Sequence, residues 1–211
     1  MSAQLSTENG QVFLAVTKAA VRRLLLVHTK LHPWLEAVFL PQSERFWRAL
    51  RKSDDCDISW QLLVTRLALE CLPKALEPFA QRRFLLRKHR SRLESSSAIE
   101  SEWNLIYRCS DLHRANYQAW EHARWLHNLC PSLFDFCLFA KTFQRHITDC
   151  SIGSFAIFLL QFSDHVDALF ELVKSLIHIY PENLNLKRIL QFDRDCCSSN
   201  QMSIYRKANN K

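Results

Sequence analysis

Apolar residues recur every three or four positions along most of the chain, which is the spacing of one face of an α-helix. Short polar stretches separate these stripes, and Pro33, Pro73 and Pro131 stand where helices would end. The pattern predicts helices over residues 13–32, 43–52, 60–71, 77–86, 99–107, 116–126, 136–147, 154–160, 166–180 and 184–188. We therefore expect an all-α protein whose helices are joined by short polar turns.

One predicted helix carries an aromatic residue and an arginine four positions apart, Trp120 and Arg124, so both lie on one helix face. A wide indole with a cation beside it suits packing between two helix pairs. The same spacing returns in two earlier helices, as the pairs Trp47 with Arg51 and Phe79 with Arg83. These pairs are predicted to be structural residues of a repeat.

The equivalent positions are spaced like the units of a helical repeat. Trp47, Phe79, Trp120, Phe155 and Leu184 follow one another at intervals of 32, 41, 35 and 29 residues. Periods of about 30–45 residues with two helices per unit are typical of an α-α solenoid, in which each helical hairpin buries its apolar face on its neighbours. A non-repetitive helical bundle with well-spaced aromatic residues is the alternative, because stripes alone do not fix topology.

The polar ends of the chain set the predicted domain limits. We expect a flexible N-terminal segment at residues 1–11, a single helical-repeat domain at residues 12–195, and a polar, disordered tail at residues 196–211. No apolar run reaches the roughly 18 residues that cross a bilayer, and the N-terminal segment lacks the order of a signal peptide. The sequence therefore predicts a cytoplasmic protein without a transmembrane segment.

Composition excludes several classes of enzyme. The chain holds only two glycines, Gly10 and Gly153, whereas P-loops, Rossmann fingerprints and nucleophile elbows all rely on glycine. Its eight cysteines include no Cys-x-x-Cys, so we predict reduced, mostly buried thiols and no metal site in this chain.

The net charge of +7 favours an acidic partner, which leaves nucleic acid, a membrane surface, a phosphorylated ligand or an acidic protein open. A basic cluster invites the first of these, but no recognised binding module accompanies it, so we expect no nucleic-acid partner. The cluster consists of Arg82, Arg83, Arg87, Lys88, Arg90 and Arg92.

Two stretches resemble a known family. Residues 73–86 read Pro-Lys-Ala-Leu-Glu-Pro-Phe-Ala-Gln-Arg-Arg-Phe-Leu-Leu, and residues 116–126 read Asn-Tyr-Gln-Ala-Trp-Glu-His-Ala-Arg-Trp-Leu. Both resemble the repeat of protein prenyltransferase α subunits, which runs roughly Pro-Lys-x-x-x-x-Trp-x-x-Arg-Arg-x-x-Leu or Asn-Tyr-x-x-Trp-x-His-Arg-x-Trp. The strong matches cover residues 62–128, and a wider comparison extends over about residues 44–192.

The resemblance implies a right-handed α-α solenoid that wraps a prenyltransferase β subunit. In that family the heterodimer transfers a farnesyl or geranylgeranyl group from its diphosphate to a C-terminal cysteine of a protein substrate. The zinc ion and its ligands belong to the β subunit, so the resemblance implies no cofactor in this chain. It also implies that the chain is inactive alone.

Three residues match active-site positions of the family. Lys74 stands five positions before Phe79, as does the α-subunit lysine that faces the isoprenoid diphosphate, and a mobile point charge suits that task. Asn116 and Tyr117 match an Asn-Tyr pair at the active-site rim. The alternatives are that Lys74 only complements a helix dipole and that Tyr117 is a packing ring.

A non-enzymatic helical-repeat scaffold for protein interactions is the rival function, because a fold does not establish an activity. A stand-alone enzyme is not expected, since adjacent sequence holds no clustered carboxylates, no nucleophile–base signature and no metal triad.

Overall fold

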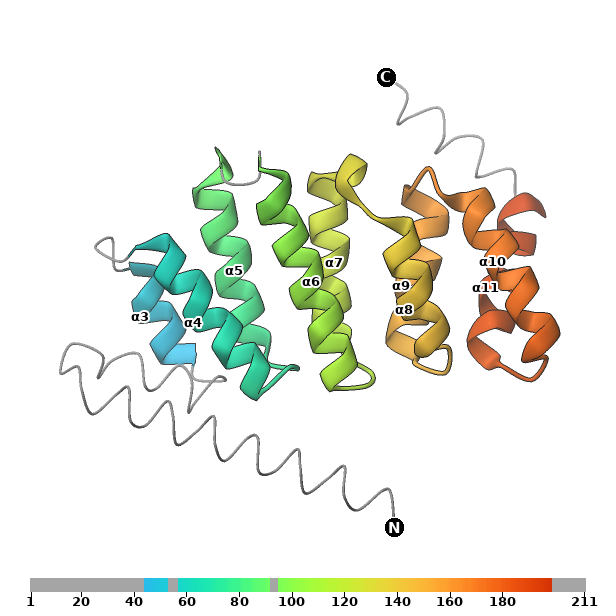
Figure 1. Ribbon diagram of the computed structural model, residues 1–211, viewed down its shortest axis with the longest axis horizontal. Helices are drawn as coiled ribbons and strands as arrows, with labels where there is room; N and C mark the ends of the chain where they lie inside the picture. Colours follow the sequence, from blue (N-terminus) through green and yellow to red (C-terminus); the bar gives the residue numbers. More distant parts are fainter. Residues whose placement is uncertain (1–43, 53–56, 92–94, 199–211) are drawn as a thin grey trace, which may run out of the picture. The chain divides into compact units, whose positions relative to one another are not determined.

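The structure is a computed structural model, and it describes residues 44–52, 57–91 and 95–198. Every regular element within these residues is a helix, which confirms the predicted all-α class for this part of the chain (Figure 1). The helix predicted at residues 13–32 and the segment at residues 1–11 lie outside the described residues.

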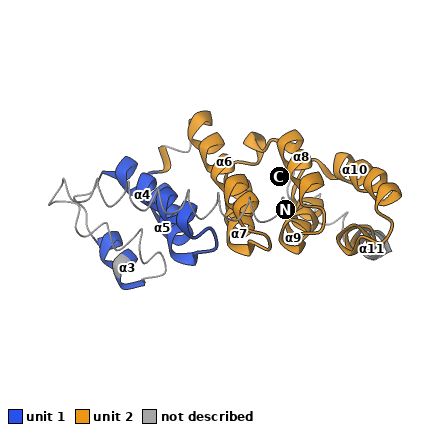
Figure 2. Cartoon of the chain, turned by 60° about the horizontal axis from the view of Figure 1, so that its bottom comes forward, with its two compact units in different colours: residues 1–89 blue, residues 90–211 orange. Residues whose placement is uncertain are grey.

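The chain divides into two compact units, residues 1–89 and residues 90–211 (Figure 2). The described part of the first unit consists of three helices, α3 (Glu44–Lys52), α4 (Ile58–Cys71) and α5 (Leu76–Lys88). In this unit α5 packs against both α3 and α4. Trp47, Leu50, Val64 and Ala68 form a buried cluster between α3 and α4, with Trp60 packed against it.

Polar side chains also join α4 to α5. Arg82 is only 4% exposed and donates to the carbonyl oxygen of Leu62 and to the hydroxyl of Thr65, both at 2.7 Å. The amide of Gln81 donates to Oε1 of Gln61 at 2.9 Å. Arg82 belongs to the basic cluster identified in the sequence. Because it is buried and bonded to α4, it is not available to bind an external anion.

The described part of the second unit contains three successive helix pairs. They are α6 (Ser96–Leu112) with α7 (Tyr117–Leu129), α8 (Phe136–Arg145) with α9 (Cys150–Phe162), and α10 (Val166–Ile179) with α11 (Leu184–Ser198); the short 3-10 helix η3 (Pro131–Leu133) follows α7. Helix α7 packs against α9, and α9 packs against α11, so the second helices of the three pairs lie side by side (Figure 2).

Trp120 lies at the junction of two consecutive pairs. Its side chain is fully buried, and its ring stacks on Phe155 of α9 with centroids 5.1 Å apart. It also meets Tyr107 of α6 and Phe139 of α8 edge-on, at 6.2 and 6.4 Å. One indole therefore links α7 to three other helices, in arrangements that aromatic rings favour.

Leu184 does not take the place of Trp120 in its helix pair. It is the first residue of α11 and is 73% exposed, whereas Leu186 and Ile189 are fully buried. The predicted equivalence is therefore wrong, because α11 buries the face that carries Leu186 and Ile189, three positions apart. The tail predicted from residue 196 begins inside α11, which continues to Ser198.

The second helix of each pair begins with a side-chain N-cap. Asn116, Asp149 and Asn183 stand directly before α7, α9 and α11, and the side-chain oxygen of each accepts a hydrogen bond from a backbone N–H of the first turn. These N-caps are 33 and 34 residues apart. Because an N-cap fixes where a helix starts, the three helices begin at regular intervals along the chain.

Candidate functional site

The three predicted site residues fall in different units. Lys74 is exposed on the turn between α4 and α5 in the first unit, next to the buried Pro73. Asn116 and Tyr117 lie in the second unit, at the start of α7.

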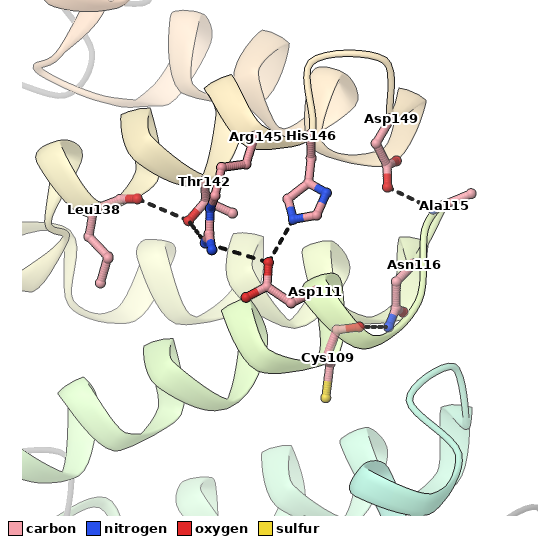
Figure 3. A network of polar contacts seen from close by, with 9 residues as sticks. All are labelled: Cys109, Asp111, Ala115, Asn116, Leu138, Thr142, Arg145, His146 and Asp149. Carbon is pink, nitrogen blue, oxygen red and sulfur yellow. Dashed lines mark hydrogen bonds and ion pairs between the residues drawn. The ribbon is translucent and has the colours of Figure 1, made fainter. Parts of the chain in front are cut away.

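Asn116 has a structural role that the sequence comparison did not indicate. Its side chain is fully buried, with Oδ1 accepting from the N–H of Ala119 and Nδ2 donating to the carbonyl oxygen of Cys109, both at 3.1 Å. These bonds tie the end of α6 to the start of α7 (Figure 3). Of the Asn-Tyr pair, only Tyr117, which is 49% exposed, meets solvent.

Tyr117 is held toward the next helix pair. Its hydroxyl donates a hydrogen bond to Sγ of Cys150, the first residue of α9, at 3.1 Å. This bond raises the pKa of Tyr117 above its ordinary value, because the proton is shared with the sulfur; burial and the charge of Asp149 act in the same direction, and Arg188 opposes them. The phenol therefore stays protonated and orients its ring along the start of α9.

A cavity of about 130 Å³ opens beside this pair. Its lining comes from three helices: Tyr117 of α7, Cys150, Gly153, Ser154 and Ile157 of α9, and Asn185 and Arg188 of α11. A side chain at Gly153 would approach the Asn185 side chain to 3.1–3.3 Å, so glycine permits the close packing of α9 on α11 here.

The charged groups at the cavity are mainly cationic. Arg188 is exposed and forms no ion pair with any residue that the structure describes. On the other side, Arg124 donates to the hydroxyl of Ser154 at 2.7 Å, pairs with Glu121 at 3.1 Å and lies over the ring of Phe158. Two guanidinium groups thus reach Ser154 and the cavity from α7 and α11.

Asp149 is the nearby carboxylate, and its oxygens are already engaged. Oδ2 accepts from the N–H of Ala115 at 2.8 Å (Figure 3). Oδ1 accepts from the N–H and the hydroxyl of Ser151, at 2.8 and 2.6 Å. Burial alone would raise the pKa of Asp149, but these hydrogen bonds and the charge of Arg114 outweigh it and hold the pKa below its usual value. Asp149 is therefore ionised and joins the α6–α7 turn to the α8–α9 turn.

Further bonds link the same turns. Asp111 at the end of α6 accepts from His146 at 2.6 Å and lies 3.5 Å from Arg145 (Figure 3). The amides of Asn183 and Asn185 both donate to the carbonyl oxygen of Ile147, at 3.2 and 3.0 Å. Each turn is thus bonded to the turn of the preceding pair, which fixes the first turns of α7, α9 and α11 relative to one another.

The six repeat-motif residues divide by chemistry. The aromatic members, Trp47, Phe79 and Trp120, are all fully buried. Among the cations, Arg51 pairs with Glu77 at 3.3 Å, Arg124 reaches Ser154, and Arg83 is half-buried in α5. These residues connect helices and lie within their packing.

Sequence reasoning missed Cys150, Ser154 and Arg188. Cys150 and Ser154 lie near a helix start about one repeat after Tyr117, Arg188 lies near a helix start two repeats after it, and nothing in their local sequence marks them. The regular spacing of the N-caps could have indicated Cys150, because Tyr117 and Cys150 each directly follow an N-cap. Residues at the same distance after the caps of neighbouring helices lie side by side once the helices pack together.

The described residues contain no group of three or more histidine, cysteine, aspartate or glutamate side chains placed to hold a metal ion. Among these residues no helix is long and apolar enough to cross a membrane. Comparison of the chain with protein-family models and with curated proteins gives no match.

Proposed function

We propose that this chain is the α-type subunit of a heterodimeric protein prenyltransferase and supports a catalytic β subunit that transfers a farnesyl or geranylgeranyl group to a protein cysteine. The proposal rests on the sequence resemblance over residues 73–86 and 116–126. Under this proposal the zinc ion and the isoprenoid diphosphate are bound in the β subunit.

The fold expected for such a subunit is an α-α solenoid. In support, three helix pairs follow one another in the second unit, their second helices pack side by side, and their N-caps recur after 33 and 34 residues. Bonds between turns reach only the preceding pair, as expected of stacked repeats. We infer that the pairs are consecutive units of such an array.

Tyr117 is the observation that carries the functional proposal. In the Asn-Tyr pair, the buried amide of Asn116 fixes the helix start, and the exposed phenol of Tyr117 is directed by Cys150 to the edge of a cavity. A rim residue must be both exposed and held in place, because a group that is already positioned loses little freedom when the substrate binds. Tyr117 meets both conditions.

Lys74 is proposed to assist the departing diphosphate. Its exposed, flexible ammonium group suits a point charge that follows a leaving group, since charge that develops in the transition state is stabilised by a nearby cation. An exposed lysine at the end of a helix is also consistent with simple dipole pairing, and the rate of transfer by a Lys74 variant separates the two roles.

Reconstitution with a β subunit tests the proposal. The chain alone should be inactive, and co-expression with a prenyltransferase β subunit should give a complex that prenylates a cysteine-terminated acceptor. In this complex Lys74→Ala and Tyr117→Phe should slow transfer while association is unchanged, and Lys141→Ala, an exposed lysine of α8, should have no effect. Failure to recover a β subunit at low salt would refute the proposal.

A scaffold without enzymatic activity is the second candidate. The burial of Asn116 favours it, because that residue cannot reach a substrate while its amide bonds both Cys109 and Ala119. The same reconstitution separates the two functions: a scaffold would bind its partner with no transfer, and turnover would be equally absent in every variant.

A further inference from the structure

The first turns of α7, α9 and α11 form an exposed row on the second unit, which we call the first-turn face. The first residues of these helices, Tyr117, Cys150 and Leu184, are all exposed, at 49% and 73% for Tyr117 and Leu184. Since α7 packs on α9 and α9 on α11, these residues follow one another across neighbouring helices. The bonds between turns hold the row in a fixed shape.

Apolar side chains extend this face at the α10–α11 turn. Ile179 is 66% exposed and Tyr180 is 49% exposed, and both precede Leu184 by a few residues. Exposed apolar groups that lie together on one edge indicate a surface used for contact. Tyrosine is also among the residues most often found at such contacts.

The cavity places a positive charge inside this apolar surface. Arg188 lines it and lies one helical turn after Leu184, on the same face of α11. Asp149 forms no ion pair with Arg188, and its oxygens accept bonds from Ala115 and Ser151. A cavity of about 130 Å³ has the volume of about four water molecules at roughly 30 Å³ each, which is room for one polar side chain.

We propose that the first-turn face docks an extended segment of a partner protein in which an aspartate or glutamate is flanked by apolar residues. The carboxylate enters the cavity and pairs with Arg188, whose planar guanidinium matches a carboxylate with two parallel hydrogen bonds. The hydroxyl of Ser154, which accepts from Arg124, lies on the same lining and donates its own proton to a remaining lone pair. The flanking apolar residues pack on Tyr117 and Leu184.

Charge complementarity selects this occupant. Arg188 has no counter-ion among the described residues, and Arg124 adds a second guanidinium beside Ser154. A basic segment would leave Arg188 unpaired, and a purely apolar segment would bury Arg188 without a partner, which is unfavourable. The inference does not require transferase activity, so it stands or falls independently of the proposed function.

Peptide selection on the isolated chain tests the inference. A display library of short random peptides is selected on the chain, and one enriched peptide is labelled for fluorescence anisotropy. The enriched peptides should share an acidic residue between apolar ones. Arg188→Glu should weaken binding by about tenfold or more, as expected when one partner of a close charge pair is reversed. Replacing the acidic residue of the peptide by its amide should have a similar effect.

Lys141→Glu is the matched control, because it makes the same charge change at an exposed residue of α8, which contributes nothing to the cavity. It should leave the affinity unchanged, and a peptide with lysine in place of its acidic residue should regain binding to the Arg188→Glu chain. Three results would each overturn the proposal: no acidic preference among the selected peptides, equal losses for the Lys141 and Arg188 variants, or Arg188-dependent binding of a single-stranded oligonucleotide in place of the peptide.

Discussion

Asp149 both caps α9 and holds the preceding turn, so its removal should destabilise the protein more than the loss of an ordinary N-cap. It accepts from Ser151 in its own helix and from Ala115 in the α6–α7 turn, and it is 3% exposed. Asp135 provides a matched comparison, because it caps α8 through a single bond from the N–H of Leu138, at 3.0 Å, and is exposed.

The expected magnitude follows from these bonds. Loss of an aspartate N-cap costs about 1 kcal/mol, and leaving the part-buried N–H of Ala115 without its acceptor costs about 1–3 kcal/mol more. Asp149→Ala should therefore lower the free energy of unfolding by about 2–4 kcal/mol, against about 1 kcal/mol for Asp135→Ala. Asp149→Asn should fall between them, because its amide keeps one accepting oxygen and cannot serve both Ser151 and Ala115.

Urea unfolding followed by circular dichroism at the helical band measures these differences. The pH dependence adds a second readout: the pKa of Asp149 is lower in the folded protein, so the unfolded state binds the proton first as pH falls. The difference in free energy of unfolding between wild type and Asp149→Asn is therefore largest above the ordinary aspartate pKa of about 3.8 and decreases as the pH falls below it. Equal losses for Asp149→Ala and Asp135→Ala would refute the bond between turns as a source of stability.

Two other residues give sharp expectations. Ala115 has a φ of 53°, in the left-handed region where glycine is less strained than alanine. Ala115→Gly should therefore stabilise the protein by about 0.5–1 kcal/mol in the same urea assay, because the relief of strain exceeds the added entropy of the unfolded chain. A loss of stability would contradict this. Burial and the charge of His165 lower the pKa of His127 below its ordinary value of 6.5, and the charge of Asp164 opposes them. The unfolded state therefore binds more protons than the folded state as pH falls. The free energy of unfolding of the wild type should decrease from about pH 7 to pH 5. His127→Phe should lose less over that range, and identical slopes for the two proteins would show that another group titrates.

The helices were predictable because their cause is local. Apolar spacing of three or four residues marked α4, α7 and α10, and their observed limits lie within a few residues of the stripes. Spacing could not show which apolar residue of a helix faces its neighbours. Leu184 illustrates this, since its place in the sequence suggested a buried position and the packing of α11 buries Leu186 instead.

The candidate site was predictable only in part, because it depends on contacts between helices. Tyr117 was identified from its place beside Asn116, but the cavity also needs Cys150 and Arg188, which lie in later helix pairs. The capping role of Asn116 followed from ordinary chemistry, as asparagine directly before a helix usually bonds its first turn. Family resemblance alone assigned this residue to the rim.

The double hydrogen bond from Asn183 and Asn185 to Ile147 also bears on how such a chain can change in length. Both amides bind one carbonyl oxygen of the pair directly before them, so the last pair recognises a backbone atom and no particular side chain. A backbone carbonyl survives almost any substitution at Ile147 itself. A helix pair that carries the same two asparagines can therefore form these bonds with another turn of this shape, where a glycine at the position of Gly153 leaves room for Asn185.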